Sequence, residues 1–283
     1  MASPSASSSP SASASASSPP NYPTYRYQPR HPNFPYTPRD FQRQDSSPDP
    51  SFYSSSRFVT HIDDNAITLL RQYYAHNLPQ TGKILDICSS WISHFPEDLE
   101  KRAVATARGE QLPKAGHDHG LHVVGMGMNK AELDANPILS SRILQDLNVD
   151  PTIPSHLAPL SASTCVVSID YLTQPLSVLS SLHTLTAPGG RIHLTISNRC
   201  FPTKVVGRWL KVDEQERLMM VADYLWWSGW REVEIVTLCD GRGRVGGEDG
   251  GGAGGFAGFA EWFGGRPDPL WVVRGVKVGD DEY

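Results

Sequence analysis

Polar and small residues follow four apolar runs of this chain, at the points where each run ends. In an open α/β sheet the carboxyl ends of parallel strands share one edge, and a ligand binds in the crevice there. We therefore expect these segments to converge on one binding crevice. They are Asp86–Ser93, Met126–Asn129, Asp146–Leu147 and Ser168–Tyr171.

Asp170 is the best-placed group for acid–base chemistry, because it ends a β-branched apolar run beside Tyr171. A carboxylate at this position could accept a proton from a hydroxyl or amine nucleophile. The alternative is a structural role, in which Asp170 forms a turn or an N-cap before the helix that contains Leu176.

Two cations lie in the segment that follows the fifth apolar run. Arg199 and Lys204 could hold an acidic group of a substrate, and the alternative is that both are ordinary surface cations. Cys200 lies between them, but the local sequence has no histidine to pair with it, so we expect no nucleophilic role.

Serines cluster with a tryptophan after the first apolar run. Ser89, Ser90 and Ser93 could cap the helix that follows, or they could hydrogen-bond a carboxylate at its N-terminus. Both interpretations stay open. Trp91 is expected in the core or in a lid rather than stacked on an adenine base.

Three histidines have spacing that suggests metal ligation. His117, His119 and His122 lie in and just after a polar loop, but no cysteine or carboxylate cluster completes a zinc site. We therefore expect no metal.

Hydrophobic spacing predicts alternating strands and helices. The strands are apolar throughout, which indicates a mainly parallel sheet with helices on both faces. The last two strands are expected to pair as an antiparallel hairpin. Strands are expected at 83–87, 121–126, 142–145, 164–169, 191–197, 232–238 and 270–276, and helices at 63–78, from 97, and at 130–135, 175–185 and 213–227.

Composition sets the expected domain boundaries. Residues 1–51 are rich in Ser, Ala and Pro and cannot bury enough apolar surface to offset their ordering entropy, so a disordered tail is expected. Residues 52–283 are expected to form one domain. Within it, the glycine-rich residues 241–268 are expected to be a flexible insertion.

Charge and cysteine usage exclude several classes of protein. The net charge is −5 without a basic block, so no nucleic-acid partner is expected, and no apolar run reaches the length of a membrane span. The four cysteines form no metal-type pair and are expected to be reduced. We expect a cytoplasmic location, with the nucleus as an alternative. An organellar transit peptide is disfavoured because the first arginine is Arg26.

Several motifs resemble those of the class I S-adenosylmethionine-dependent methyltransferases of the type 11 kind. Ile84-Leu85-Asp86-Ile87-Cys88-Ser89-Ser90 stands in the place of the family's hydrophobic-Leu-Asp-x-Gly-x-Gly motif. Val123–Met126 is similar to the strand that precedes the ribose contact, and Gln145-Asp146-Leu147 to the turn that reads the adenine. Leu185–Arg191, with its Pro188-Gly189-Gly190, is similar to the turn before the fifth strand.

The resemblance implies a Rossmann-like, seven-stranded, mostly parallel sheet with an antiparallel closing hairpin. It implies S-adenosyl-L-methionine as cofactor and an unidentified small-molecule acceptor. Asp170 would be the catalytic base, and Arg199 and Lys204 would bind the acceptor. The implied cofactor contacts are Asp86, Cys88, Ser89, Ser90, Met126, Gly127, Asp146, Leu147 and Ser168.

Three departures from the family pattern define the alternatives. Cys88 and Ser90 replace glycines, which makes positive φ angles costlier. Gly127 stands where the family has a ribose-binding acid, and Ser163-Thr164 replaces a Phe-Asp pair. The alternative function is a catalytically inactive binding or scaffold protein of the same fold. A nicotinamide-dependent oxidoreductase is not expected, because G-x-G-x-x-G is absent after the first strand.

Overall fold

The computed structural model describes residues 20–110, 120–241 and 267–279. His117 and His119, the first 19 residues and most of the glycine-rich insertion lie outside these ranges. Among the described residues, no helix combines the length and the apolar content that crossing a membrane needs.

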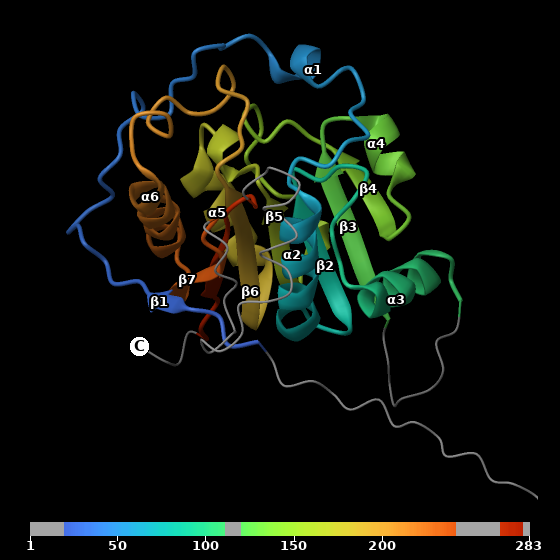
Figure 1. Cartoon of the computed structure of the whole chain (residues 1–283). Helices are drawn as coiled ribbons and strands as arrows, with labels where there is room; N and C mark the ends of the chain where they lie inside the picture. Colours follow the sequence, from blue (N-terminus) through green and yellow to red (C-terminus); the bar gives the residue numbers. More distant parts are fainter. Residues whose placement is uncertain (1–19, 111–119, 242–266, 280–283) are drawn as a thin grey trace, which may run out of the picture.

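A single eight-stranded sheet forms the centre of the protein, in the order β1-β7-β8-β6-β5-β2-β3-β4 (Figure 1). Strands β2 to β6 run parallel, whereas β8, β7 and β1 are added in antiparallel pairings. The strands are β1 Thr24–Arg26, β2 Gly82–Ile87, β3 Leu121–Gly127, β4 Leu139–Leu144, β5 Leu160–Val166, β6 Thr186–Ser197, β7 Arg231–Cys239 and β8 Leu270–Val276. The predicted Rossmann-like α/β fold and its closing hairpin are confirmed.

β2 is the point at which the chain changes direction across the sheet. Ile84 of β2 is in register with Val123 of β3 on one side and with Ala162 of β5 on the other. The chain builds β3 and β4 on the first side and then crosses over to build β5 and β6. The switch point of the sheet therefore lies at the carboxyl ends of β2 and β5.

Helices cover both faces of the sheet. α2 (Asp64–Asn77) and α3 (Glu97–Ala107) pack on one face, and α5 (Pro175–Leu185) and α6 (Glu214–Trp227) on the other. Alternate side chains of each buried strand feed the two apolar cores, as Ile84 and Leu85 of β2 do. Two short helices, α1 (Asp49–Phe52) and α4 (Lys130–Ala135), lie at the carboxyl edge of the parallel strands (Figure 1).

Residues 20–51 are packed on the domain, and the expected domain start at residue 52 is therefore too late. β1 pairs with β7, which gives the sheet one strand more than the seven expected. Tyr27 and Tyr36 are buried, and their hydroxyl groups both bond the carboxylate of buried Asp223 on α6. From β1 the chain runs around α6 to α1 (Figure 1). Buried tyrosine rings and the shared Asp223 carboxylate help to hold this segment on the domain. The average composition of the segment does not reveal such individual contacts.

Candidate functional site

A cavity of about 600 Å³ lies at the carboxyl ends of the parallel strands, beside the switch point. Its volume falls within the range of pockets that hold small molecules, about 300–1,000 Å³. Every residue predicted to contact a cofactor lines it: Asp86, Cys88, Ser89, Ser90, Met126, Gly127, Asp146, Leu147 and Ser168. The structure thus brings these residues together, and their role as cofactor contacts stays a prediction.

Asp86 organises the turn that follows β2. Its Oδ2 accepts hydrogen bonds from Ser89 Oγ at 2.7 Å and from Ser93 Oγ at 2.8 Å. Its Oδ1 accepts a hydrogen bond from Thr164 Oγ1 of β5 at 2.8 Å. Burial raises the pKa of Asp86, and the three hydroxyl groups oppose that rise. The carboxyl group therefore holds the turn against β5, which fixes the position of this cavity wall.

Cys88 adopts a conformation that glycine would adopt more cheaply. Its φ is +53°, in the left-handed region. His94 and Val167 also line the cavity with φ values of +54° and +41°. Left-handed backbone at non-glycine residues costs about 1–3 kcal/mol each and persists where the surroundings impose it, often at functional sites. The strain here is greatest at Val167, whose side chain is β-branched.

Gly127 is a glycine because the turn after β2 lies directly against it. The Ser89 amide donates a hydrogen bond to the Met126 carbonyl at 2.8 Å. A Cβ atom at Gly127 would lie 2.2 Å from the Ser89 carbonyl oxygen. No side chain fits at this position without movement of the backbone, so the acid that the family carries there is sterically excluded.

Glu132 on α4 brings a carboxylate to the same wall, and sequence reasoning missed it. One oxygen accepts a hydrogen bond from Ser90 Oγ at 2.6 Å and the other from the Arg57 backbone amide at 2.7 Å. In sequence, Glu132 resembles an ordinary first-turn residue, because it lies three positions after Asn129, which caps α4. Its position at the cavity is apparent only in the folded chain, where residue 57 packs against it.

His94 is a buried, neutral residue of the cavity wall. Its Nδ1 is buried and has no hydrogen-bond partner within the described parts of the chain. The pKa of His94 is lowered to about 4, chiefly by burial, with Arg71 and the neighbouring His61 acting in the same direction. The imidazole is therefore neutral at pH 7.

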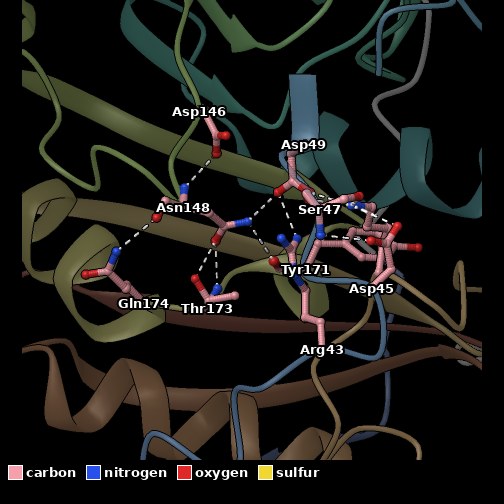
Figure 2. A network of polar contacts seen from close by, with 10 residues as sticks. Arg43, Asp45, Ser47, Asp49, Asp146, Asn148, Tyr171, Thr173 and Gln174 are labelled. Carbon is pink, nitrogen blue, oxygen red and sulfur yellow. Dashed lines mark hydrogen bonds and ion pairs between the residues drawn. The ribbon is translucent and has the colours of Figure 1, made fainter. Parts of the chain in front are cut away.

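Asn148, in the loop after β4, ties the cavity wall to the N-terminal segment (Figure 2). Its backbone amide donates to Asp146 Oδ1 at 2.9 Å. Its Nδ2 donates to Asp49 Oδ2 at 2.9 Å and to the Tyr171 carbonyl at 3.1 Å, and its Oδ1 accepts from the Thr173 amide at 2.7 Å. One side chain thus links α1 to the loops after β4 and β5.

Lys204 does not face the cavity, and its predicted role in substrate binding is wrong. The side chain is fully buried, and Nζ lies 3.1 Å from Asp45 and 3.2 Å from Asp49. It also donates to the Ser47 carbonyl at 2.8 Å. Asp49 is paired in turn with Arg43 at 2.8 Å (Figure 2). Because residues 43–49 were expected to be disordered, the sequence showed no partner that would bury Lys204.

Arg199 lines the cavity as predicted, but its charge is paired. Its Nε lies 2.6 Å from Asp268 Oδ2, and the side chain is 59% exposed. The Asp268 carboxylate also accepts a hydrogen bond from the Asp63 backbone amide at 3.0 Å. Arg199 thus links the loop after β6 to the start of α2, and its charge is largely compensated.

Asp170 lies outside the cavity, contrary to the prediction that it is the catalytic base. β5 ends at Val166, and residues Ile169–Tyr171 form a 3-10 turn, so Asp170 points into the core beside Trp209. Burial raises the pKa of Asp170 to about 8, and its Oδ2 lacks a hydrogen-bond partner among the described residues. The expected strand 164–169 had placed this carboxyl at the strand end.

Aromatic rings and an arginine form the wall that faces the strand ends. Phe201, in the loop after β6, packs against Phe52 and against the edge of His61, with ring centroids 5.4 and 5.7 Å apart. The Arg57 guanidinium lies 4.4 Å from the Phe52 ring and 5.1 Å from the Phe201 ring. Sequence reasoning missed Arg57 and His61. Only the density of aromatic residues near residue 52 could have suggested a packed segment.

Trp91 lies at the cavity wall near these residues. Its indole N–H donates to the Val59 carbonyl at 3.1 Å, and its ring meets Phe58 at 6.3 Å. This contact places Trp91 between the turn after β2 and the segment before α2. Its place in the core or in a lid stays a prediction.

No family model matches the chain, and no curated protein matches it. Among solved structures, the chain is similar to Haemonchus contortus phosphoethanolamine N-methyltransferase 2 (11% identity, TM-score 0.44), covering 75% of this chain and 52% of that one. The chain thus spans about half the length of the first structures that it matches.

Two further similar structures cover most of their own chains. One is in the Haloferax volcanii complex of the Trm112 methyltransferase activator with a methyltransferase (13% identity, TM-score 0.45), covering 78% of this chain and 92% of that one. The other is a TehB-like S-adenosylmethionine-dependent methyltransferase of Corynebacterium glutamicum (12% identity, TM-score 0.41), covering 75% of this chain and 87% of that one. At these scores the likeness carries no argument for an activity, so the function is argued from the cavity.

Proposed function

We propose that this protein is an S-adenosylmethionine-dependent methyltransferase that acts on a small-molecule acceptor. The observation that carries the proposal is the cavity at the switch point of the sheet, bounded by the loops that the motif resemblance implies. Ligands of open α/β sheets bind at this position. The cavity volume of about 600 Å³ suits a small-molecule acceptor.

The charges of the cavity favour a cationic cofactor over an anionic dinucleotide. Of the four carboxyl groups that line it, Asp49 is paired with Arg43 and Lys204, and the pKa of Asp86 is raised, which leaves Glu132 and Asp146 without an ion-pair partner among the described residues. A dinucleotide diphosphate would meet these groups without the glycine-rich phosphate loop that such cofactors use. S-adenosylmethionine carries a sulfonium and an ammonium group, which carboxylates attract. The donor set therefore fits the proposed cofactor.

Several residues of the chain are suited to hold this cofactor. The turn at Cys88 provides the backbone conformation that a glycine would otherwise provide. Asp146 and Leu147 would bound the adenine end, as the resemblance implies. Glu132 would take the place of the ribose-binding acid, which the backbone around Gly127 excludes. When bound, the cofactor supplies a methyl group on a good leaving group, so the protein has chiefly to position the acceptor.

His61 is better placed than Asp170 to accept a proton from the acceptor. It lines the cavity, whereas Asp170 does not. Desolvation lowers the pKa of His61, Arg57 lowers it further, and Glu132 opposes both. The imidazole is therefore neutral and able to accept a proton at pH 7. Transfer would decline as pH falls through this lowered pKa.

Calorimetric titration of the full chain with S-adenosylmethionine and with S-adenosylhomocysteine tests the proposal. We expect saturable heat with both, and none with NAD at equal concentration. Ser168→Tyr, which fills the cavity, should abolish the heat, whereas Ser141→Tyr on the exposed side of β4 should not. Absence of heat with both sulfur nucleosides at millimolar concentration would refute the proposal.

A catalytically inactive binding protein is the second candidate, because Gly127 leaves no space for the family's ribose-binding acid. The two candidates differ in whether they transfer a methyl group to an acceptor. For an active enzyme, a labelled methyl group should pass to an acceptor from a metabolite panel, and His61→Ala should lower that transfer about 100-fold or more while leaving cofactor binding intact. Binding without transfer to any acceptor would favour the inactive form.

A further inference from the structure

Arg57 is the cavity arginine whose guanidinium pairs with no carboxylate of the described residues. Of the three cations near the acceptor side, Arg199 is paired with Asp268 and Lys204 is buried among acidic residues outside the cavity. Arg57 lines the cavity. Within the described residues, its side chain donates one hydrogen bond, from Nη2 to the Phe52 carbonyl at 3.3 Å.

The surroundings of Arg57 hold its guanidinium in place and leave donors free. The Cζ atom lies 4.4 Å from the centroid of the Phe52 ring and 5.1 Å from that of the Phe201 ring. A guanidinium held by ring contacts keeps N–H groups available, in a fork that matches a carboxylate or a phosphate. The Arg57 backbone is also fixed, by its amide hydrogen bond to Glu132 at 2.7 Å. A preorganised donor of this kind loses little entropy when it binds an anion.

The carboxyl groups nearby do not cancel this charge. Asp49 is compensated by Arg43 and by Lys204. Asp86 is bound by three hydroxyl groups at the far wall, and its pKa is raised. Glu132 is engaged by Ser90 and by the Arg57 backbone rather than by its side chain.

We propose that Arg57 binds an oxyanion of the methyl acceptor, so that the acceptor is a small molecule that carries a carboxylate or a phosphate group. The proposal rests on the proposed function, because it names the substrate class of the same cavity. His61 and Arg57 both approach the Phe201 ring, so a bound oxyanion would place the rest of the acceptor near the imidazole. Arg57 takes the anchoring role that the sequence had assigned to Lys204.

The test observes the guanidinium directly. Full-length protein is labelled with 15N-arginine, and the Arg57 Nε–Hε resonance is identified by its absence in Arg57→Lys. Inorganic phosphate and acetate are titrated separately, against sodium chloride at matched ionic strength, with S-adenosylhomocysteine present. We expect a saturable shift with at least one oxyanion and none with chloride. A stronger response to phosphate indicates phosphate esters, and an equal or stronger response to acetate indicates carboxylates.

Matched variants give a second readout. In calorimetry, Arg57→Gln should weaken binding of the responding oxyanion about 10-fold or more, the usual effect of losing a charge-assisted hydrogen bond. Arg108→Gln, at an exposed arginine that does not line the cavity, should leave that affinity unchanged. Thermal melting identifies any variant that fails to fold, and Arg57→Lys, which keeps the charge, should weaken binding less than Arg57→Gln.

Two results would overturn the inference. One is an Arg57 resonance that moves no more with phosphate or acetate than with chloride. The other is a shift caused by S-adenosylhomocysteine alone that abolishes the oxyanion response, which would assign Arg57 to the cofactor carboxylate. The cofactor heat on the same sample separates the two proposals. Cofactor heat without an oxyanion response removes only this inference, and an oxyanion response without cofactor heat removes the methyltransferase.

Discussion

The two walls of the cavity are built on different physical principles. One wall consists of the turns after β2, β3, β4 and β5, each fixed by the buried strand that precedes it. The other consists of the segment around α1 and the loop after β6, which meet through ion pairs and an edge-to-face ring contact. The first wall can be inferred from local apolar patterns. The second depends on partners far apart in the sequence, such as Lys204 and Asp49.

This difference teaches where function is hardest to predict. The strand-end wall carries the predicted cofactor contacts, and all of them line the cavity. The other wall carries Arg57 and His61, the groups that we assign to the acceptor, and neither was predicted. Both residues lie between the expected domain start at residue 52 and the helix expected from residue 63, where no motif or apolar pattern marks them. The groups that we assign to the acceptor thus lie where the sequence signal is weak.

Loss of the Lys204 charge should give the largest loss of stability, because Lys204 pairs with two acidic residues of the segment around α1. Lys204→Met leaves Asp49 buried with Arg43 as its one remaining ion-pair partner among the described residues. Removing one member of a buried ion pair costs about 3–5 kcal/mol. We expect a fall of that size in the free energy of unfolding in urea, together with faster proteolysis before residue 62. Arg199→Met removes a charge that is 59% exposed, and Asp268 keeps its hydrogen bond from the Asp63 amide, so this change should cost less, about 1 kcal/mol. Equal losses would show that the Lys204 network does not hold the wall.

Asp170→Asn tests whether the strand-end wall includes Asp170. The folded pKa of about 8 lies above the unfolded value of 3.8, so the unfolded state loses its proton first. The wild-type protein therefore loses stability as pH rises from about 4 to 8, and an asparagine does not. We expect Asp170→Asn to gain nothing at pH 4 and up to about 4 kcal/mol at pH 7, by urea unfolding at each pH. Cofactor affinity should not change, and a large loss of affinity would place Asp170 in the site.

The smallest loss of stability is expected when a methyl group is added at Gly127, in the strand-end wall. Gly127→Ala pushes Cβ against the Ser89 backbone carbonyl, which cannot rotate away, and should cost about 1–3 kcal/mol and weaken cofactor binding. Gly125→Ala, two residues earlier in β3, is the matched control. Its Cβ meets a methyl group of Leu139, at the end of a flexible side chain, so a smaller loss is expected. Equal losses in urea unfolding would mean that the turn is not rigid.

Much of the fold can be predicted from local patterns. The predictions that failed did so for identifiable reasons. Apolar runs separated by helical spacing predict the parallel strands, and the last two strands pair as expected. β1 was missed because three exposed residues carry no apolar pattern. The end of β5 was placed too late because Val167 continues the β-branched run, although its positive φ ends the strand. Asp170 was consequently assigned to the site and lies outside it.

The amino-acid sequence determines where the crevice forms, because buried strands end at small and polar residues whatever the rest of the chain does. It also determines that Asp86 begins the turn beside the crevice. Tertiary packing decides which charges remain available there. Lys204 is buried and paired with Asp45 and Asp49, Arg199 is paired with Asp268, and Arg57 lies against two rings. Electrostatic pairing depends on distances in space, and no local pattern records the distance between residues that are far apart in the sequence.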